Sequence, residues 1–203
     1  MSRGKTTNLL LAGVGGQGVI LATYALCEAA LAEGYDVKQN DVVGMSQRGG
    51  SVMSHLRFGE KVSSPLVTQG AADILLSFEL VEALRYINWL KPGGLLIYND
   101  MRINPAPVAA GLASYPSDVK ERIEASWDRT LAVDAAALAT EAGNAKAANM
   151  ALLGALAGCL PFDDATWQEV VKKVVPPKTI EANLKAFEAG RAVGTAMTGQ
   201  CGR

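Results

Sequence analysis

The sequence contains few of the residues from which metal sites are commonly built. Its 203 residues include one histidine and three cysteines, Cys27, Cys159 and Cys201, which lie far apart in the chain. Because no C-x-x-C pair occurs, we expect neither an iron–sulfur cluster nor a structural zinc, and no metal site, in this chain. An odd number of scattered cysteines is typical of a reducing compartment, so we expect a cytoplasmic protein.

The chain also lacks a surplus of positive charge and an uninterrupted hydrophobic span. Nineteen Lys and Arg residues balance twenty Asp and Glu residues, which argues against a nucleic-acid partner. The one long uncharged stretch, residues 6–27, has Gly13, Gly15, Gly16 and Gly18 in its middle. These glycines would break a membrane-spanning helix or the core of a signal peptide, so we expect no membrane partner and no export.

What the sequence does contain predicts an α/β protein. Hydrophobic residues make up 49% of the chain and charged residues 19%, which is enough for a sizeable core. The alternation of apolar strands with helical segments predicts a Rossmann-like, mostly parallel sheet with flanking helices and a helical C-terminal segment. We expect strands at 9–11, 35–39, 51–58, 61–64, 72–78, 95–98 and 131–133, and helices at 18–33, 79–90, 135–142, 145–160, 164–173 and 178–193.

The predicted elements form one domain over residues 1–195. Its helical C-terminal part begins near residue 134, and residues 196–203 are expected to form a loose tail. Residues 104–116 are rich in proline and alanine and are expected to form a surface loop.

A glycine-rich turn follows the first predicted strand. Gly13, Gly15 and Gly18 have the spacing G-x-G-x-x-G between a strand and a helix. In this pattern the first glycine permits a tight turn, the second permits close approach of a ligand, and the third permits close packing of helix and sheet. The helix N-terminus then faces any bound anion. A phosphate-bearing ligand is therefore predicted at Gly13, Gly15, Gly16, Gln17 and Gly18; the alternative is a turn that binds nothing.

A second glycine-rich loop, residues 44–50, follows the second predicted strand. In a Rossmann-like unit it lies at the same sheet edge as the first turn. Its single arginine offers planar donors suited to phosphate or carboxylate, and its two final glycines allow close backbone approach. The alternative is a glycine-rich connection with an ordinary surface arginine. The candidate binding residues of this loop are Ser46, Gln47, Arg48, Gly49 and Gly50.

Four further polar residues are weaker candidates for binding. His55, the only histidine, follows the second loop on the next strand, and Asn149 interrupts an otherwise apolar helix, where a buried amide needs partners. Asp36, within the second predicted strand, and Asp41, just after it, are candidates for the ribose-binding acid that a dinucleotide enzyme places after this strand. The alternatives are a structural histidine, an exposed amide and ordinary turn residues.

No catalytic residue can be assigned from the sequence. It has no nucleophile elbow, no P-loop lysine, no metal-ligand cluster and no paired carboxylates. We therefore expect a chain that binds a ligand and acts as a subunit of a larger enzyme.

Four stretches together resemble a known family. They are residues 13–19 (GVGGQGV), 44–55 (GMSQRGGSVMSH), 91–94 (KPGG) and 148–154 (ANMALLG). Over residues 8–194 the chain is similar to the gamma-type domain of the 2-oxoacid:ferredoxin oxidoreductases, and most similar to the members that act on indolepyruvate. The second stretch is specific to this family, whereas the first is shared with unrelated nucleotide-binding proteins.

The resemblance implies an obligate partner, a larger alpha subunit that binds thiamine diphosphate and [4Fe-4S] clusters. The complex would decarboxylate an arylpyruvate such as indolepyruvate oxidatively, form an aryl-acetyl-CoA and pass electrons to ferredoxin. This chain would bind no cofactor tightly alone, would be inactive alone, and would form a wall of the active site or of the coenzyme A site. The residues from Gly13 to Gly18, with Arg48, would contact phosphates of the bound cofactor. A homodimer or a heterotetramer is expected.

Three alternatives remain open at this point. Related gamma domains serve pyruvate, 2-oxoglutarate and branched-chain 2-oxoacids, and no residue of the four stretches reads an indole ring. The glycine pattern with Asp41 is compatible with a stand-alone NAD-dependent oxidoreductase. A non-catalytic assembly subunit with a purely structural glycine turn is the third.

Overall fold

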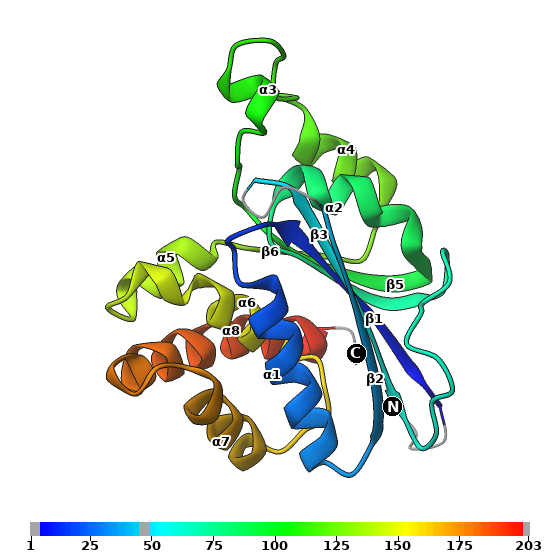
Figure 1. The fold of residues 1–203 in the computed structure, drawn as a ribbon, viewed down its shortest axis with the longest axis vertical. Helices are drawn as coiled ribbons and strands as arrows, with labels where there is room; N and C mark the ends of the chain where they lie inside the picture. Colours follow the sequence, from blue (N-terminus) through cyan, green and yellow to red (C-terminus); the bar gives the residue numbers. More distant parts are fainter. Residues whose placement is uncertain (1–4, 45–48, 201–203) are drawn as a thin grey trace.

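The centre of the molecule is a six-stranded sheet. The computed structural model describes residues 5–44 and 49–200. The strand order is β2-β3-β1-β4-β5-β6 (Figure 1). β4, β5 and β6 run parallel to β1, while β3 is antiparallel to both β1 and β2. This arrangement confirms the predicted mostly parallel sheet. The strands are β1 (Thr7–Val14), β2 (Asp36–Val43), β3 (Ser51–Gly59), β4 (Ala72–Ser77), β5 (Leu90–Asn99) and β6 (Thr130–Val133).

Helices cover both faces of the sheet. α1 and α5 to α8 lie on one face, and α2 and α4 lie on the other (Figure 1). None of the described helices is both long enough and apolar enough to span a bilayer. The helices are α1 (Val19–Ala32), α2 (Leu80–Tyr86), η1 (Ile87–Trp89), α3 (Ala106–Ala109), α4 (Val119–Ser126), α5 (Ala135–Glu141), η2 (Ala145–Ala147), α6 (Ala148–Ala157), α7 (Asp164–Val174), η3 (Pro177–Thr179) and α8 (Ile180–Gln200).

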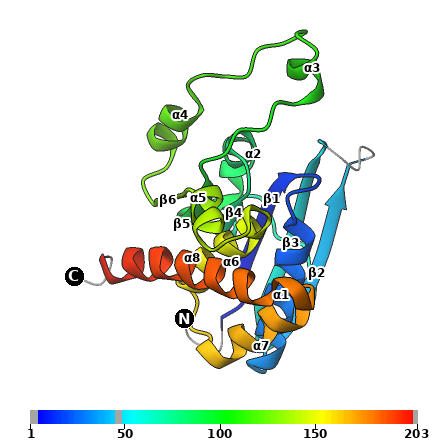
Figure 2. The same ribbon diagram turned by 90° about the vertical axis from the view of Figure 1, so that its left-hand side faces the viewer.

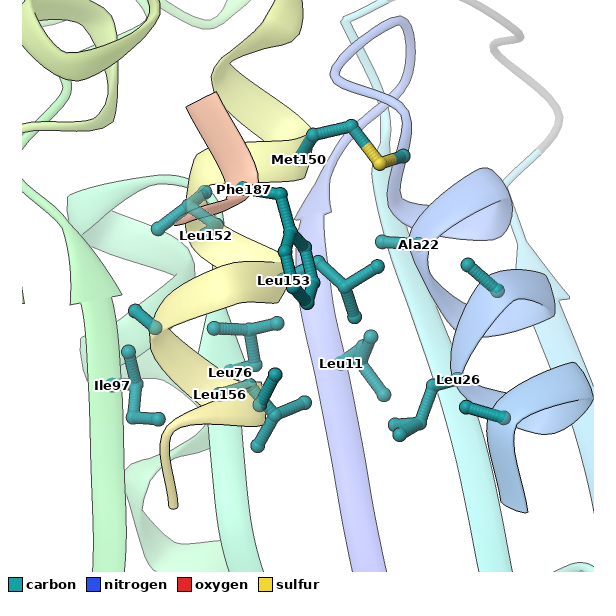
Figure 3. Close-up of a cluster of buried hydrophobic side chains, with 14 of the residues drawn as sticks. Leu11, Ala22, Leu26, Leu76, Ile97, Met150, Leu152, Leu153, Leu156 and Phe187 are labelled. Carbon is teal, nitrogen blue, oxygen red and sulfur yellow. The ribbon is translucent and has the colours of Figure 1, made fainter. Parts of the chain in front are cut away.

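The alternation of side chains along the strands creates two cores. On β1, Leu9 and Leu11 belong to the core beneath α1 and α6, whereas Leu10 belongs to the core beneath α2 and α4. Figure 3 shows Leu153 and Leu156 of α6 among the strand side chains of the first core. α6 is buried on almost every side because it lies between the sheet and α8.

α6 and α8 are in direct backbone contact. A Cβ built on Gly190 would lie 1.9 Å from the carbonyl oxygen of Ala151, and one on Gly154 would lie 2.0 Å from that of Phe187. Any side chain larger than hydrogen at these positions would therefore push the helices apart. The contact is built from two G-x-x-x-G pairs, Gly154 with Gly158 on α6 and Gly190 with Gly194 on α8.

The short return strand predicted at 61–64 is wrong. This backbone bonds to side chains instead of joining a strand ladder. The N–H of Val62 donates to Asp36 Oδ2 at 2.8 Å, and the carbonyl of Ser64 accepts from Arg57 Nη1 at 2.9 Å.

The loose tail predicted from residue 196 is also wrong as far as Gln200, since α8 continues to that residue. Gly194 of α8 packs on Ala155 and Met197 packs against the first core, so packing supports the helix beyond residue 195. Residues 201–203, with Cys201, lie outside the described residues.

The helix predicted at 79–90 ends at Tyr86 and is followed by a 3₁₀ turn, and α4 was not predicted.

The segment after β5 leaves the body of the protein as a long arm that contains α3. Figure 2 shows this arm standing apart from the sheet and the helical layers. It is largely exposed, as the prediction of a surface loop requires, and Leu112 at its tip is 83% exposed.

Candidate functional site

The two glycine-rich loops meet at the carboxyl end of β1. The N–H of Gly15 donates to the carbonyl of Gly50 at 2.8 Å, and the N–H of Gly49 donates to the carbonyl of Gly15 at 3.4 Å. Gly49 has a φ of +76°, a conformation that L side chains rarely adopt. The predicted convergence of the loops is confirmed. The candidates Ser46, Gln47 and Arg48 lie outside the described residues.

Gln17 ties the first glycine turn to the neighbouring strand. Its Oε1 accepts from the N–H of Val14 at 2.7 Å, and its Nε2 donates to the carbonyl of Phe78, just after β4, at 2.7 Å. The structure gives Gln17 a structural role, while the ligand contact at this residue stays a prediction. The amide holds the ends of β1 and β4 in a fixed relation and stabilises the turn between them.

The glycines of the turn are required for different structural reasons. Gly13 lies inside β1, where a Cβ would meet Val19 and Phe78 at 2.7 and 2.8 Å, so close packing and not a tight turn excludes a side chain. Gly16 and Gly18 have φ values of +102° and +80°. The sequence predicts that Gly18 permits close packing of helix and sheet; the nearest atom to a Cβ on Gly18 would instead be Asn149 Nδ2 of α6, at 2.6 Å. Gly18 therefore packs on α6.

A cleft of about 570 Å³ opens beside this turn. It lies at the carboxyl ends of β1, β4 and β5, where the helices after β1 and β4 leave toward opposite faces of the sheet. Doubly wound α/β proteins bind ligands at this position. The lining residues are Gly15, Gly16, Gln17, Phe78, Asn99, Met101, Ile103, Ala145, Lys146, Ala148, Asn149 and Leu152.

Lys146 brings a positive charge to the cleft. It lies in the 3₁₀ turn before α6, and among the described residues no carboxylate pairs with it. Asn149, one helical turn later, lines the same cleft, and its Nδ2 lies beside Gly18 at the start of α1. A lysine, a side-chain amide and a glycine turn suit the oxygen atoms of a phosphate or a carboxylate. Of these two residues in the cleft lining, which are three positions apart, the sequence analysis named Asn149 as a candidate and did not name Lys146.

The opposite wall of the cleft is fixed by a buried carboxylate. Glu79 is 1% exposed and accepts from the N–H of Ile103 at 3.1 Å and from Tyr115 Oη at 2.5 Å. Burial and the adjacent Glu79 carboxylate raise the pKa of the Tyr115 phenol above its usual value. The guanidinium of Arg102 lies 4.3 Å from the centre of the Tyr115 ring. These contacts attach both ends of the exposed arm to the start of α2.

A smaller hollow of about 330 Å³ lies on the other side of the turn, toward β2. It is lined only by apolar residues and glycines, so the glycine turn separates it from the cleft that contains Lys146 and Asn149. Its lining residues are Val14, Gly15, Gly16, Gly18, Val19, Ile20, Val43 and Val52.

His55 lies away from both hollows, in the middle of the sheet. It is 4% exposed, its Nδ1 accepts from the N–H of Val67 at 3.3 Å, and its ring packs edge-on against Trp89. Burial lowers the pKa of this imidazole. The structure thus places His55 in a packing role beneath the α2 face, and it does not join the other candidates.

The candidate aspartates lie on β2, outside the cleft. Asp41 accepts from Ser54 Oγ at 2.6 Å and from Gln39 Nε2, while Asp36 pairs with Lys38. No group of three or more potential metal-ligating side chains is found in residues 5–44 and 49–200.

Comparison with known proteins places the chain in a family. A family model described as pyruvate ferredoxin/flavodoxin oxidoreductase matches residues 8–193. Indolepyruvate oxidoreductase subunit IorB of Thermococcus kodakarensis is 46% identical over 96% of this chain and 99% of its own length. The subunit of the same name from Pyrococcus horikoshii is 47% identical over 92% and 95%.

A solved structure agrees with these sequence matches. The gamma subunit of a keto/oxoacid ferredoxin oxidoreductase from Geobacter sulfurreducens superposes with a TM-score of 0.70, is 25% identical, and covers 94% of this chain and 99% of its own. Sequence and fold agree over nearly the whole length. The chain therefore belongs to the pyruvate ferredoxin/flavodoxin oxidoreductase family.

Proposed function

We propose that this chain is the smaller subunit of an indolepyruvate:ferredoxin oxidoreductase. The observation that supports this most strongly is the 46% identity to a subunit of that name, which covers both chains almost completely. The complex cleaves the bond between the carboxyl and keto carbons of an arylpyruvate and releases CO₂. The remaining acyl group is oxidised and joined to the thiol of coenzyme A, and the electron pair passes to ferredoxin.

We assign thiamine diphosphate and the iron–sulfur clusters to a larger partner subunit. The described residues of this chain offer no cysteine cluster, and Cys27 is buried with its Sγ donating to Gln39 Oε1 at 3.0 Å. The chain is accordingly inactive without its partner. Its cytoplasmic location stays an expectation from its cysteine content.

The role of this chain in that reaction is to hold the phosphate groups of coenzyme A in the cleft. Support comes from the Lys146 charge, the Asn149 amide and the left-handed glycine turn at one cavity of about 570 Å³. Arg48 is proposed as a second cationic contact from the neighbouring loop. The cleft lining includes no aromatic side chain beyond Phe78, so we assign the choice among 2-oxoacids to the partner subunit.

The stand-alone NAD-dependent alternative has less support. A ribose-binding acid must present a free carboxylate to the ligand, and the Asp41 carboxylate accepts hydrogen bonds from both Ser54 and Gln39.

The test is co-expression of the chain with a large iron–sulfur subunit encoded beside it. Anaerobic reduction of ferredoxin that requires both indolepyruvate and coenzyme A, and that occurs only with the pair, is the expected result. Tight nicotinamide nucleotide binding and dehydrogenase activity of the single chain would contradict the proposal.

A variant pair tests the cleft. Loss of a charge-assisted contact of about 1.5–3 kcal/mol predicts that Lys146→Ala raises the KM for coenzyme A by about 10- to 150-fold, with the KM for indolepyruvate unchanged. The control is Lys185→Ala, which removes an exposed lysine paired with Glu181 on α8. Equal kinetics of the two variants would exclude Lys146 from the binding site.

A further inference from the structure

The sheet has one long open edge. β2 pairs with β3 over all eight of its residues, and no strand from the described part of the chain pairs with its other side (Figure 2). The opposite edge strand, β6, is only four residues long. β2 contains no proline and no bulge, which are two of the features that protect an exposed edge, although it carries a third, the charged side chain of Lys38. Such an edge is a template for a further strand.

The backbone groups on the open side of β2 can be identified from the ladder. Gly44 donates to the carbonyl of Ser51, so residues of even number in β2 bond to β3. Because hydrogen-bonding direction alternates along an antiparallel strand, residues of odd number point their N–H and C=O groups outward. Among the described residues none bonds to these outward groups. They belong to Val37, Gln39, Asp41 and Val43.

We propose that a second copy of this chain pairs with this edge, antiparallel and about a two-fold axis at Asn40. Only odd residues can bond to odd residues across the new ladder, and the four outward residues are symmetric about residue 40. In the register that places Asn40 opposite Asn40 of the copy, every outward residue meets an outward residue. The two sheets then form one continuous sheet, with both α1 helices on the same face.

The side chains in this register are complementary. Val37 lies opposite Val43 of the copy, and Gln39 lies opposite Asp41, so apolar meets apolar and amide meets carboxylate. Gln39 already donates to Asp41 within one chain, which shows that the two groups form hydrogen bonds in this environment. On the other face Lys38 lies opposite Val42. No like charges face each other directly, which an edge that pairs with itself must avoid.

Exposed apolar side chains gather beside this edge. Five of the eight exposed large hydrophobic residues in the described part of the chain lie on α1 and the end of β2. On α1 they form a stripe in which Ile20, Tyr24 and Leu31 are 45%, 44% and 54% exposed, and on β2 they are Val42 and Val43. Ile20 and Val43 line the same hollow, and Cys27 Sγ donates to Gln39 Oε1, so this stripe lies along β2. Pairing carries Leu31 of one copy toward Ile20 of the other and covers both stripes.

Cysteine cross-linking tests the register. Asn40 and its copy form a pair without mutual hydrogen bonds, in which Cα atoms are about 4.5 Å apart and a disulfide can form. In the full chain we expect Asn40→Cys to give a disulfide-linked dimer under mild oxidation. Lys38→Cys, on the same face but opposite Val42, should give no more dimer than the unsubstituted chain. Equal cross-linking of the two variants, or none at position 40, would overturn the register.

Charge substitution tests the pairing itself. Gln39→Asp sets two carboxylates opposite each other on both sides of the axis, and we expect at least a ten-fold weaker dimer by analytical ultracentrifugation. Gln39→Lys faces the same Asp41 with a cation and should retain the dimer. Thermal unfolding of both variants separates loss of pairing from loss of folding. A monomeric unsubstituted chain whose binding to its larger partner is weakened by Gln39→Asp would assign the edge to that partner and overturn the proposal.

Discussion

Replacing Gly190 by alanine should destabilise the protein, whereas the same substitution in most helices is stabilising. In a solvent-exposed helix, glycine to alanine stabilises the protein by about 1 kcal/mol because alanine has the higher helix propensity. Here the new Cβ would lie 1.9 Å from the carbonyl oxygen of Ala151. Carbon and oxygen atoms in contact are about 3.3 Å apart, so α6 and α8 must separate by more than about 1 Å.

The separation of the two helices determines how strongly the substitution should destabilise the protein. Overpacking of a well-ordered core costs about 1–3 kcal/mol and more when backbone must move, and here the obstacle is backbone on both helices. Movement of α8 also withdraws the fully buried Phe187 from its neighbours. Because backbone must move here, we take a cost of about 3–4 kcal/mol; after the gain of about 1 kcal/mol in helix propensity is subtracted, we expect a loss of about 2–3 kcal/mol in the free energy of unfolding. For a chain of this size that lowers Tm by roughly 4–12 °C.

The assay is urea and thermal unfolding followed by circular dichroism. Glu188→Ala is the matched control, because it lies two residues away on the same helix and is exposed. It should change the free energy of unfolding by less than about 0.5 kcal/mol. If Gly190→Ala were as stable as the unsubstituted protein, the close approach of the two helices would not be the reason for glycine at this position.

Three further predictions concern single side chains. Gly18→Ala should cost about 1–3 kcal/mol through its positive φ and its contact with Asn149, and adding Asn149→Ala should recover the part due to contact, as measured by denaturant unfolding. Cys27, whose pKa is raised to about 12 mainly by burial, should resist iodoacetamide at pH 8 until the protein is unfolded, so rapid alkylation of Cys27 itself in the native protein would contradict its burial. Burial lowers the pKa of His55, so the unfolded state binds a proton at this residue more readily than the folded state does. The free energy of unfolding should therefore fall as the pH drops below about 6.5. His55→Gln should weaken this pH dependence, and an unchanged pH dependence would exclude His55 as its cause.

Local signals predicted the parts of the fold in which neighbouring residues determine the structure. The apolar run at 9–11 and the glycines after it define a strand and a turn without distant contacts, and the structure has both. Gly34, with a φ of +82°, ends the first helix as expected. The meeting of the two glycine loops followed from the rule that parallel strands end at one edge of the sheet.

The remaining features depend on residues that are distant in sequence. Lys146 reaches the cleft only because α6 packs beside the glycine turn. No short sequence pattern predicts that packing. Residues 38–41 are polar, so the sequence pattern did not indicate that the strand extends to Val43. The helix beyond residue 195 follows from contacts with α6. Tertiary packing decided each of these against the local preference.

The glycine contact between α6 and α8 has a consequence for the order in which the protein matures. Synthesis delivers the sheet, the glycine turn and α6 before Gly190 and Gly194 have left the ribosome. Until then the face of α6 that will meet α8 is exposed to solvent, and the helix that carries Asn149 has no support behind it. The cleft therefore takes its final shape late, and until then the nascent chain exposes an apolar helix face of the kind that chaperones bind.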